Sequence, residues 1–156
     1  YRVSLNEGNS LITIEEEINT IRNYLIIQEM RYKDLLEVEY NLDDSCNDYK
    51  IIKLVLQPLV ENSIYHGIRN KEQKGKIIIS TYQDNENIFL TVEDNGLGIT
   101  IEKIEDIYNN KGIGVGLRAT KERLRIFYGE KFRFIVESKV GIGTKITIQI
   151  PKEKLS

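Results

Sequence analysis

Three short clusters of polar and glycine residues in this 156-residue chain could carry chemistry. In the first, Glu61, Asn62 and Tyr65 follow Pro58 in an otherwise apolar stretch. On a helix, Glu61 and Tyr65 share one face and Asn62 lies one step around it. A carboxylate beside an amide oxygen offers ligands for Mg²⁺ and a general base, which suits phosphate chemistry. A solvated stripe on a core helix is the competing interpretation.

The second cluster is the turn Asp94-Asn95-Gly96-Leu97-Gly98, at the end of an expected strand. An Asp-Asn-Gly sequence alone is an ordinary turn signal. Here the spacing of Gly96 and Gly98 lets the backbone approach a ligand closely. A buried carboxylate at Asp94 could accept a hydrogen bond from the exocyclic amino group of adenine. The turn is therefore a candidate adenine site.

The third cluster places Gly112, Gly114 and Gly116 at alternate positions directly before an expected helix. Such spacing frees backbone N–H groups to surround phosphate, and the helix N-terminus adds to the attraction. The pattern is neither the P-loop nor the dinucleotide fingerprint, because the lysine, the glycine spacing and the preceding strand are missing. A flexible loop explains this cluster about equally well.

Composition restricts the class of protein. Hydrophobic residues make up 40% and charged residues 29% of the chain, which is typical of a folded domain rather than a disordered one. The 22 basic and 24 acidic residues nearly cancel, which argues against a general nucleic-acid binder. Cys46, the single cysteine, lies among acidic residues that disfavour a reactive thiolate. Since the chain starts at Tyr1 rather than Met, we expect a fragment with a membrane segment upstream.

The hydrophobic periodicity predicts three helices and five strands. Thr13 and Glu16 have the spacing of a capping box. Helices are expected over residues 14–32, 53–66 and 117–128, the second kinked or started by Pro58. Strands are expected over residues 36–42, 77–82, 88–92, 133–138 and 144–150. This order predicts an α+β two-layer sandwich, in which helices cover one face of a mixed, largely antiparallel sheet. Residues 13–151 would form the domain, after a lead-in over 1–12 and before a tail over 152–156.

In this order and with these separations, the three clusters resemble the N box and two glycine boxes of the GHKL ATPases. Residues 56–62 (Leu-Gln-Pro-Leu-Val-Glu-Asn) are similar to those of LytS-type sensor histidine kinases in particular. The opening helix with Glu15-Glu16-Glu17 and the step Gly143-Thr144 into the last strand are similar too. The resemblance covers residues 13–151.

The resemblance implies the Bergerat ATP-binding fold, with ATP and Mg²⁺ as ligands. Asn62 would be the Mg²⁺ ligand, and Glu61 the polar partner that assists transfer. Asp94 would recognise adenine, supported through water by Thr144. The rest of the nucleotide pocket would be formed by Tyr65, His66, Asn95, Gly96, Gly98, Gly112, Gly114, Gly116 and Leu117. Residues 99–111 would form the lid.

The resemblance also implies partners and a location. The phosphoacceptor histidine would lie on an upstream segment, since His66 is the only histidine and falls within the nucleotide motif. A response regulator would then receive the phosphoryl group. We expect the isolated domain to be monomeric and the full protein to be a homodimer, with this domain on the cytoplasmic side of a membrane-bound sensor kinase and no nucleic acid bound.

One departure leaves alternatives open. Tyr65 stands where many histidine kinases carry a lysine that contacts phosphate. Lys111, Arg118 or the run Arg69, Lys71 and Lys74 are the candidate replacements. Another GHKL kinase or ATPase, such as an anti-sigma-factor serine kinase, is one alternative. A non-catalytic module that binds nucleotide weakly and acts by protein contact is the other.

Overall fold

Five strands form the sheet in the computed structural model, which describes residues 11–68, 73–109 and 115–152. They are β2 (Leu36–Asn41), β4 (Gly75–Gln83), β5 (Asn87–Asp94), β6 (Arg133–Lys139) and β7 (Gly143–Pro151). Their order in space is β2-β4-β5-β7-β6. β2 runs parallel to β4 and the other neighbours are antiparallel. The expected mixed, largely antiparallel sheet is therefore confirmed.

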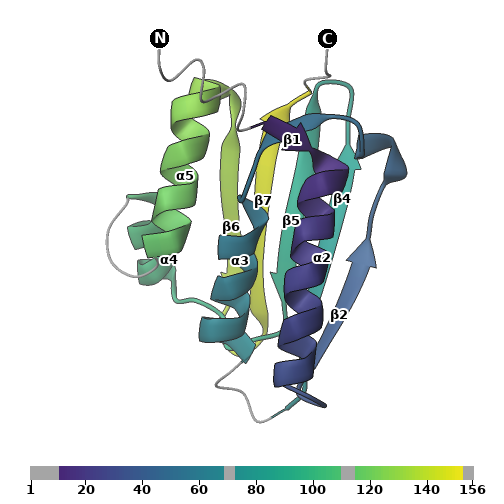
Figure 1. Ribbon diagram of the computed structural model, residues 1–156. Coiled ribbons are helices and arrows are strands. Elements are labelled where there is room, and N and C mark those ends of the chain that lie inside the picture. Colours follow the sequence, from purple (N-terminus) through teal and green to yellow (C-terminus); the bar gives the residue numbers. More distant parts are fainter. Residues whose placement is uncertain (1–10, 69–72, 110–114, 153–156) are drawn as a thin grey trace.

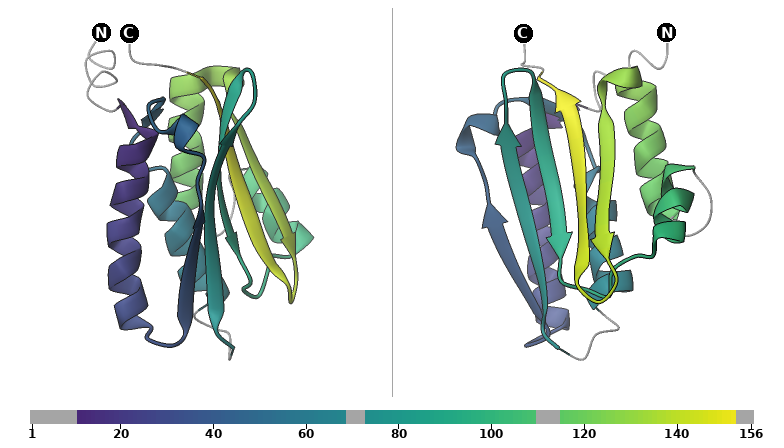
Figure 2. Two further views of the ribbon diagram at one scale, coloured as in Figure 1. Left: turned by 90° about the vertical axis from the view of Figure 1, so that its right-hand side faces the viewer. Right: turned by 180° about the vertical axis from the view of Figure 1, so that it is seen from behind.

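Helices α2 (Ile14–Arg31), α3 (Leu56–Asn62) and α5 (Val115–Tyr128) cover one face of this sheet, and no helix among the described residues covers the other face (Figures 1 and 2). Apolar residues at alternate strand positions point toward the helices, and those at helical spacing on α2 meet them. The fully buried members of this core include Ile21, Leu25, Ile79, Leu90 and Ile148. The expected two-layer α+β sandwich is therefore confirmed.

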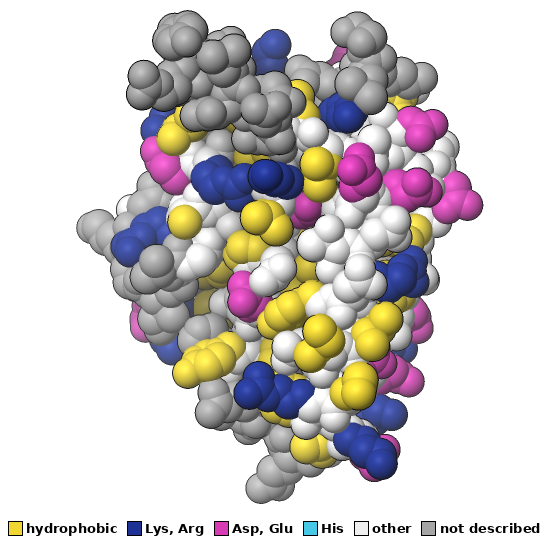
Figure 3. Space-filling view, viewed as in Figure 1, with side chains coloured by type: hydrophobic (Ala, Val, Ile, Leu, Met, Phe, Trp, Pro, Cys, Tyr) yellow, Lys and Arg dark blue, Asp and Glu magenta, His cyan; other side chains and the backbone are white. Residues whose placement is uncertain are grey.

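The start of α2 has the expected capping box. The Glu16 backbone N–H donates to Thr13 Oγ1 at 3.1 Å, and the Thr13 N–H donates to Glu16 Oε1 at 3.1 Å. The Thr13 backbone N–H and, to a smaller extent, the Thr13 hydroxyl donate to the Glu16 carboxyl and lower its pKa. On its outer side α2 exposes Ile26, Ile27 and Met30, and apolar side chains spread over the central and lower part of the helix-covered face (Figure 3).

Two three-residue strands were not predicted. β1 (Leu11–Thr13) pairs antiparallel with β3 (Lys50–Ile52), and a 3-10 turn over Asp44–Cys46 precedes β3. Leu11 and Ile12 pack against the core, so the fold begins inside the expected lead-in. The pair brings the start of α2 next to β3, and β3 leads into α3. Toward the other end of the chain, β7 ends at Pro151.

The helices near the clusters differ from their predicted bounds. The helix expected over 53–66 begins only at Leu56, because Leu54 has a left-handed backbone (φ 62°) that no helix accommodates. Pro58 lies in its first turn, where a missing N–H is tolerated. From Ser63 to Ile68 the chain continues as a π-helix, η2. α5 begins at Val115 and ends with the 3-10 turn Gly129–Lys131.

A fourth helix, α4 (Ile101–Tyr108), lies in the stretch expected to form the lid, where no helix was predicted. Thr100 caps it by accepting from Lys103 N at 3.3 Å. Ile104 and Ile107 pack against the core while Ile101 is exposed. The lid segment is thus an amphipathic helix over most of its length. None of the helices in the described ranges is both long and apolar enough to span a bilayer.

Candidate active site

Strands β5 and β7 bring Asp94 and Thr144 side by side at one end of the sheet. The two residues are Cα partners in the antiparallel register, and each is 6% exposed. Asp94 is in phase with the buried Leu90 and Val92, so its carboxylate belongs to the inward face of β5. Its Oδ1 accepts a hydrogen bond from Gly96 N at 2.8 Å. This bond fixes the orientation of a buried carboxylate at the predicted turn.

The turn after Asp94 packs closely against the hairpin that joins β6 to β7. Gly98 has φ 79°, and a Cβ there would lie 2.3 Å from Lys139 O. Gly143 has φ 150°, and a Cβ there would lie 2.0 Å from Asp94 O. The Gly141 N–H donates to Leu97 O at 2.7 Å. Glycine is therefore required at Gly98 and Gly143 by both backbone conformation and space.

Ser138 joins these parts, and sequence reasoning did not single it out. Its Oγ accepts from Ile99 N at 2.7 Å and donates to Gly143 O at 2.9 Å. Thr144 Oγ1 lies 2.8 Å from the Ser138 Oγ. Because the one Ser138 hydroxyl proton is directed to Gly143 O, Thr144 is the donor in the second bond and its own oxygen keeps acceptor capacity. The serine therefore orients the threonine beside Asp94.

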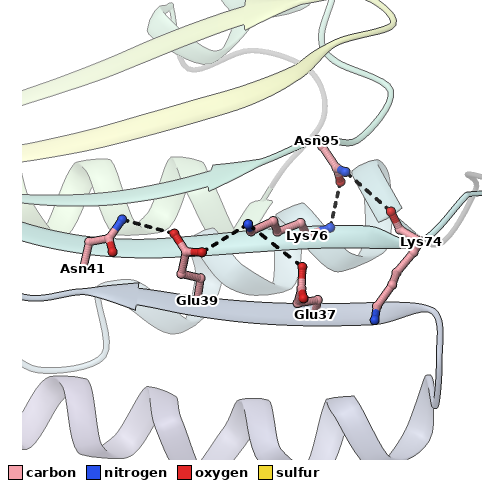
Figure 4. Close-up of polar contacts among 6 residues, drawn as sticks. All are labelled: Glu37, Glu39, Asn41, Lys74, Lys76 and Asn95. Atoms are coloured by element: carbon pink, nitrogen blue, oxygen red, sulfur yellow. Dashed lines mark hydrogen bonds and ion pairs between the residues drawn. The ribbon is translucent and has the colours of Figure 1, made fainter.

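The Asn95 side chain forms hydrogen bonds with the backbone around the start of β4. Its Oδ1 accepts from Lys76 N at 2.7 Å, and its Nδ2 donates to Lys74 O at 3.4 Å (Figure 4). The Lys76 side chain lies between Glu39 and Glu37 of β2, with Nζ 3.1 Å from Glu39 Oε1. Asn95 thereby fixes the turn to the sheet. A direct contact between Asn95 and nucleotide stays a prediction.

The N-box residues face in different directions. Asn62 is half-buried, whereas Glu61 and Tyr65 are exposed, Tyr65 by 59%. Burial raises the pKa of Tyr24 on α2, and the nearby Glu61 carboxylate adds to the rise, which places Glu61 on the α2 side of α3. The adjoining Ser63 is 2% exposed. The side chain of His66 lies outside the described residues.

Asn62 lines a cavity of about 380 Å³ between α3, α4, α5 and the glycine turn. Leu97, Gly98 and Ile99 form its turn side, and Leu117 of α5 forms another wall. Leu117 itself is 2% exposed. Two residues expected from different clusters, Asn62 and Gly98, are thus brought to one cavity by the fold.

The lid helix adds two charges that were not predicted. Lys103 and Asp106, one turn apart on α4, line the same cavity as Asn62. The signal was present in the sequence, since Thr100 is a typical N-cap and Ile101, Ile104 and Ile107 follow at helical spacing.

α4 is held to the body through its last residue. Val136 N on the edge strand β6 donates to Tyr108 Oη at 2.8 Å, and Lys121 Nζ donates to Tyr108 O at 2.6 Å. Desolvation at this contact lowers the pKa of Lys121. α4 is therefore anchored at one end in this structure.

Several predicted residues lie outside the described part of the chain. These are Gly112 and Gly114 of the third cluster, and the candidate cations Lys111, Arg69 and Lys71. Gly116 is described and lies in the first turn of α5, where a Cβ would lie 3.7 Å from Pro58 Cβ, an ordinary contact. Its proposed role toward phosphate stays a prediction.

Known proteins are similar to this chain in sequence and in architecture. The family described as histidine kinase-, DNA gyrase B- and HSP90-like ATPase matches residues 47–154, and a histidine kinase family matches residues 1–36. The sensor protein LytS of Staphylococcus haemolyticus is 32% identical over 152 residues, which cover 94% of this chain and 26% of LytS. The chain thus spans about a quarter of the length of such curated relatives.

Solved structures agree on the fold. The catalytic domain of histidine kinase ThkA superposes with a TM-score of 0.69 at 22% identity, over 91% of this chain and 96% of that one. ThkA in complex with the response regulator protein TrrA superposes with a TM-score of 0.66 at 19% identity, over 92% of this chain and 41% of that one. From these matches and the site geometry, the chain belongs to the histidine kinase-, DNA gyrase B- and HSP90-like ATPase family, as the ATP-binding catalytic domain of LytS-type sensor histidine kinases.

Proposed function

We propose that this domain binds Mg-ATP between the Asp94 turn and helix α3, and transfers the γ-phosphoryl group to a histidine on another segment of the full protein. The observation that carries the proposal is that one short turn links the two ends of the site. The glycine turn begins at Asp94, whose carboxylate is buried, and ends at Gly98. Gly98 lines the same cavity as Asn62. A nucleotide can therefore place its base at Asp94 and its phosphates at Asn62.

The base end favours adenine over guanine. The Asp94 carboxylate is an acceptor, and the exocyclic amino group of adenine is a donor. Guanine presents a carbonyl oxygen at that position, so two acceptors would face each other in a buried site. This mismatch costs about 1–3 kcal/mol, and more where the acceptor is charged. The Thr144 oxygen, oriented by Ser138, would support the base through a water molecule.

The phosphate end needs a divalent cation. Among the described residues that line the cavity, Lys103 and Asp106 carry opposite charges that cancel, so these residues offer the triphosphate no net positive charge. No group of three or more His, Cys, Asp or Glu side chains in the described ranges could hold a metal ion by itself. Asn62 supplies one amide oxygen. This set fits Mg²⁺, which is usually bound through few protein ligands together with water and phosphate oxygens.

Phosphoryl transfer in this site would rest on positioning and charge neutralisation. Bound Mg²⁺ would offset the charge that builds on the phosphate oxygens. Asn62 would hold the triphosphate end, and Lys103 of α4 would reach it from the lid side. Closure of the lid would exclude water, so that the incoming histidine nitrogen rather than water attacks the γ-phosphorus as ADP leaves. Glu61 would assist from the α2 side of α3.

The full protein would relay this phosphoryl group to a response regulator aspartate. The ThkA structure with its regulator TrrA supports such a partner. Because the chain spans about a quarter of its curated relatives, the phosphoacceptor, the dimerising segment and a membrane attachment belong to the proposal for the whole protein. Within it, this domain would lie in the cytoplasm and would be monomeric when isolated.

Incubation with Mg-ATP labelled in the γ-phosphate tests the transfer. We expect the full protein to gain acid-labile, base-stable label typical of phosphohistidine, and this chain alone to gain none. Asn62→Ala in the full protein should abolish the label, whereas the matched change Asn41→Ala on the exposed surface of β2 should leave it. Acid-stable label on serine of another protein would instead favour a serine kinase. A folded chain that binds no ATP would favour the protein-contact module.

A further inference from the structure

The turn that leads from β3 into α3 is held by side chains from two other helices. Glu17 of α2, which is 2% exposed, accepts from Leu54 N at 2.9 Å, Val55 N at 2.8 Å and Leu56 N at 3.0 Å. From the opposite direction, Arg123 of α5 donates to Leu54 O at 3.0 Å and to Lys53 O at 2.6 Å. One carboxylate thus accepts hydrogen bonds from the N–H groups of the turn, and one guanidinium donates hydrogen bonds to its carbonyls.

The backbone in this clamp is not in a relaxed conformation. Leu54 has φ 62°, a region that side-chain-bearing residues rarely adopt. Such a conformation persists only where the surroundings determine it, and outliers of this kind gather at functional sites. Here both the N–H and the carbonyl of Leu54 are bound, by Glu17 and Arg123 respectively. The clamp therefore fixes the turn rather than merely covering it.

The clamp also defines where α3 begins. Val55, the residue that precedes the helix, offers no side-chain cap, and Pro58 has no N–H to satisfy. Glu17 accepts instead from the N–H groups of Val55 and Leu56, and its negative charge suits the positive end of the helix. Asn62 is the last residue of the same helix, within two turns of Leu56. A shift at the clamp would therefore move α3 and, with it, Asn62.

The second half of the clamp connects α3 to the lid side of the cavity. Arg123 lies on α5, the helix that begins at Val115 directly after the glycine cluster. Leu117, less than two turns before Arg123, lines the same cavity as Asn62. α5 thus carries one wall of the phosphate cavity and also grips the start of the helix that bears Asn62.

We infer that Glu17 and Arg123 are positioning residues that set Asn62 for the Mg²⁺-bound triphosphate and couple α5 to α3. The inference rests on the proposed function, because it assigns these side chains a role in that site. Neither residue touches the nucleotide in it. They act through the turn at Leu54, so their loss should impair the phosphate end of the site and spare the adenine end at Asp94.

Calorimetric titration of the chain with ATP, in Mg²⁺ and in EDTA, and with adenosine tests the inference. In Glu17→Gln a donor NH₂ group must face at least one of the three N–H groups, and Arg123→Lys cannot bind two carbonyls as a fork. Mg²⁺ should raise the ATP affinity of the wild-type chain, and we expect this increase, the Mg²⁺ gain, to be smaller by a factor of about ten or more in both variants. Losses of this size occur when partners that orient a ligating group are removed. Affinity for adenosine should stay as in the wild type.

Matched controls separate positioning from loss of stability. Glu16→Gln makes the same change one residue along α2, where glutamine keeps the capping box, and Arg125→Lys alters a surface pair with Glu122. Both should keep the wild-type Mg²⁺ gain. A merely structural role would lower thermal stability yet leave the Mg²⁺ gain of the folded variants within twofold of wild type, and that result would overturn the inference.

The remaining outcomes are also decisive. If Glu17→Gln does not fold, Arg123→Lys decides the matter, because this partly exposed side chain keeps its charge and one carbonyl contact. A wild-type Mg²⁺ gain in that variant would count against the inference. If wild-type chain binds adenosine and ATP without any Mg²⁺ gain, the proposed function fails at its phosphate end, and the inference fails with it for a distinguishable reason.

Discussion

Replacing Gly98 with alanine should destabilise the domain and weaken ATP binding together. Gly98 has φ 79°, and an added Cβ would lie 2.3 Å from Lys139 O and 2.9 Å from Val140 Cα. The left-handed backbone costs alanine about 1–2 kcal/mol. Relief of the contact requires the hairpin backbone to move, which adds about 1–3 kcal/mol. The expected loss in free energy of unfolding is therefore about 2–5 kcal/mol.

Gly141→Ala is the matched control for this change. Gly141 has nearly the same backbone, with φ 82°, but an added Cβ would meet nothing within 4 Å. It should therefore cost only the backbone share, about 1–2 kcal/mol. Urea unfolding followed by circular dichroism measures both variants, and calorimetry with Mg-ATP measures binding. Equal losses in Gly98→Ala and Gly141→Ala would refute the close packing of the turn on the hairpin.

Three further changes have separate readouts. Lys103→Ala removes an exposed charge and should lower Mg-ATP affinity by about 0.5–1 kcal/mol, as measured by calorimetry, while adenosine affinity stays unchanged. An equal loss for both ligands would contradict a contact between Lys103 and the phosphates. Tyr108→Phe removes the acceptor of Val136 N, so hydrogen exchange of that amide should accelerate, and unchanged protection would contradict the anchor of α4. The hydrogen bond from Lys76 holds the pKa of Glu39 below its ordinary 4.5, so the pair stabilises the fold above that pH and the contribution is lost as pH falls through the lowered pKa. In Lys76→Met the Glu39 pKa should return toward 4.5 by NMR titration, and an unchanged value would argue against the pair.

Local patterns were enough to predict the strands and the position of Asp94 at the end of one of them. Alternation through Leu90 and Val92 places Asp94 in phase with the core, and the register with β7 then brings Thr144 beside it. The capping box at Thr13 likewise involves residues only three positions apart in the sequence. Such features depend on periods of two or 3.6 residues, which a single sequence displays directly.

Features that depend on distant partners were not predictable in this way. β1 and β3 are three residues each and become strands only because Leu11 pairs with Ile52. The late start of α3 reflects Leu54, whose backbone is held by Glu17, 37 residues earlier, and by Arg123, 69 residues later. Ser138 acquires its role only when the hairpin packs on the turn. α4 is different, because its cap and the spacing of its isoleucines are visible in the sequence although no helix was predicted there.

Titration of the wild-type chain with Mg-ATP and with Mg-GTP, beside Asp94→Asn, tests the central claim most directly. The account predicts saturable binding of ATP, with GTP weaker by about tenfold or more because an acceptor would face the Asp94 carboxylate. Asp94→Asn should weaken ATP binding by a similar factor. The carboxylate accepts from Gly96 N and would also accept from the adenine amino group, and a neutral amide makes a poorer acceptor for these two donors. A folded chain that binds ATP and GTP equally, or binds neither, would contradict an adenine site at Asp94.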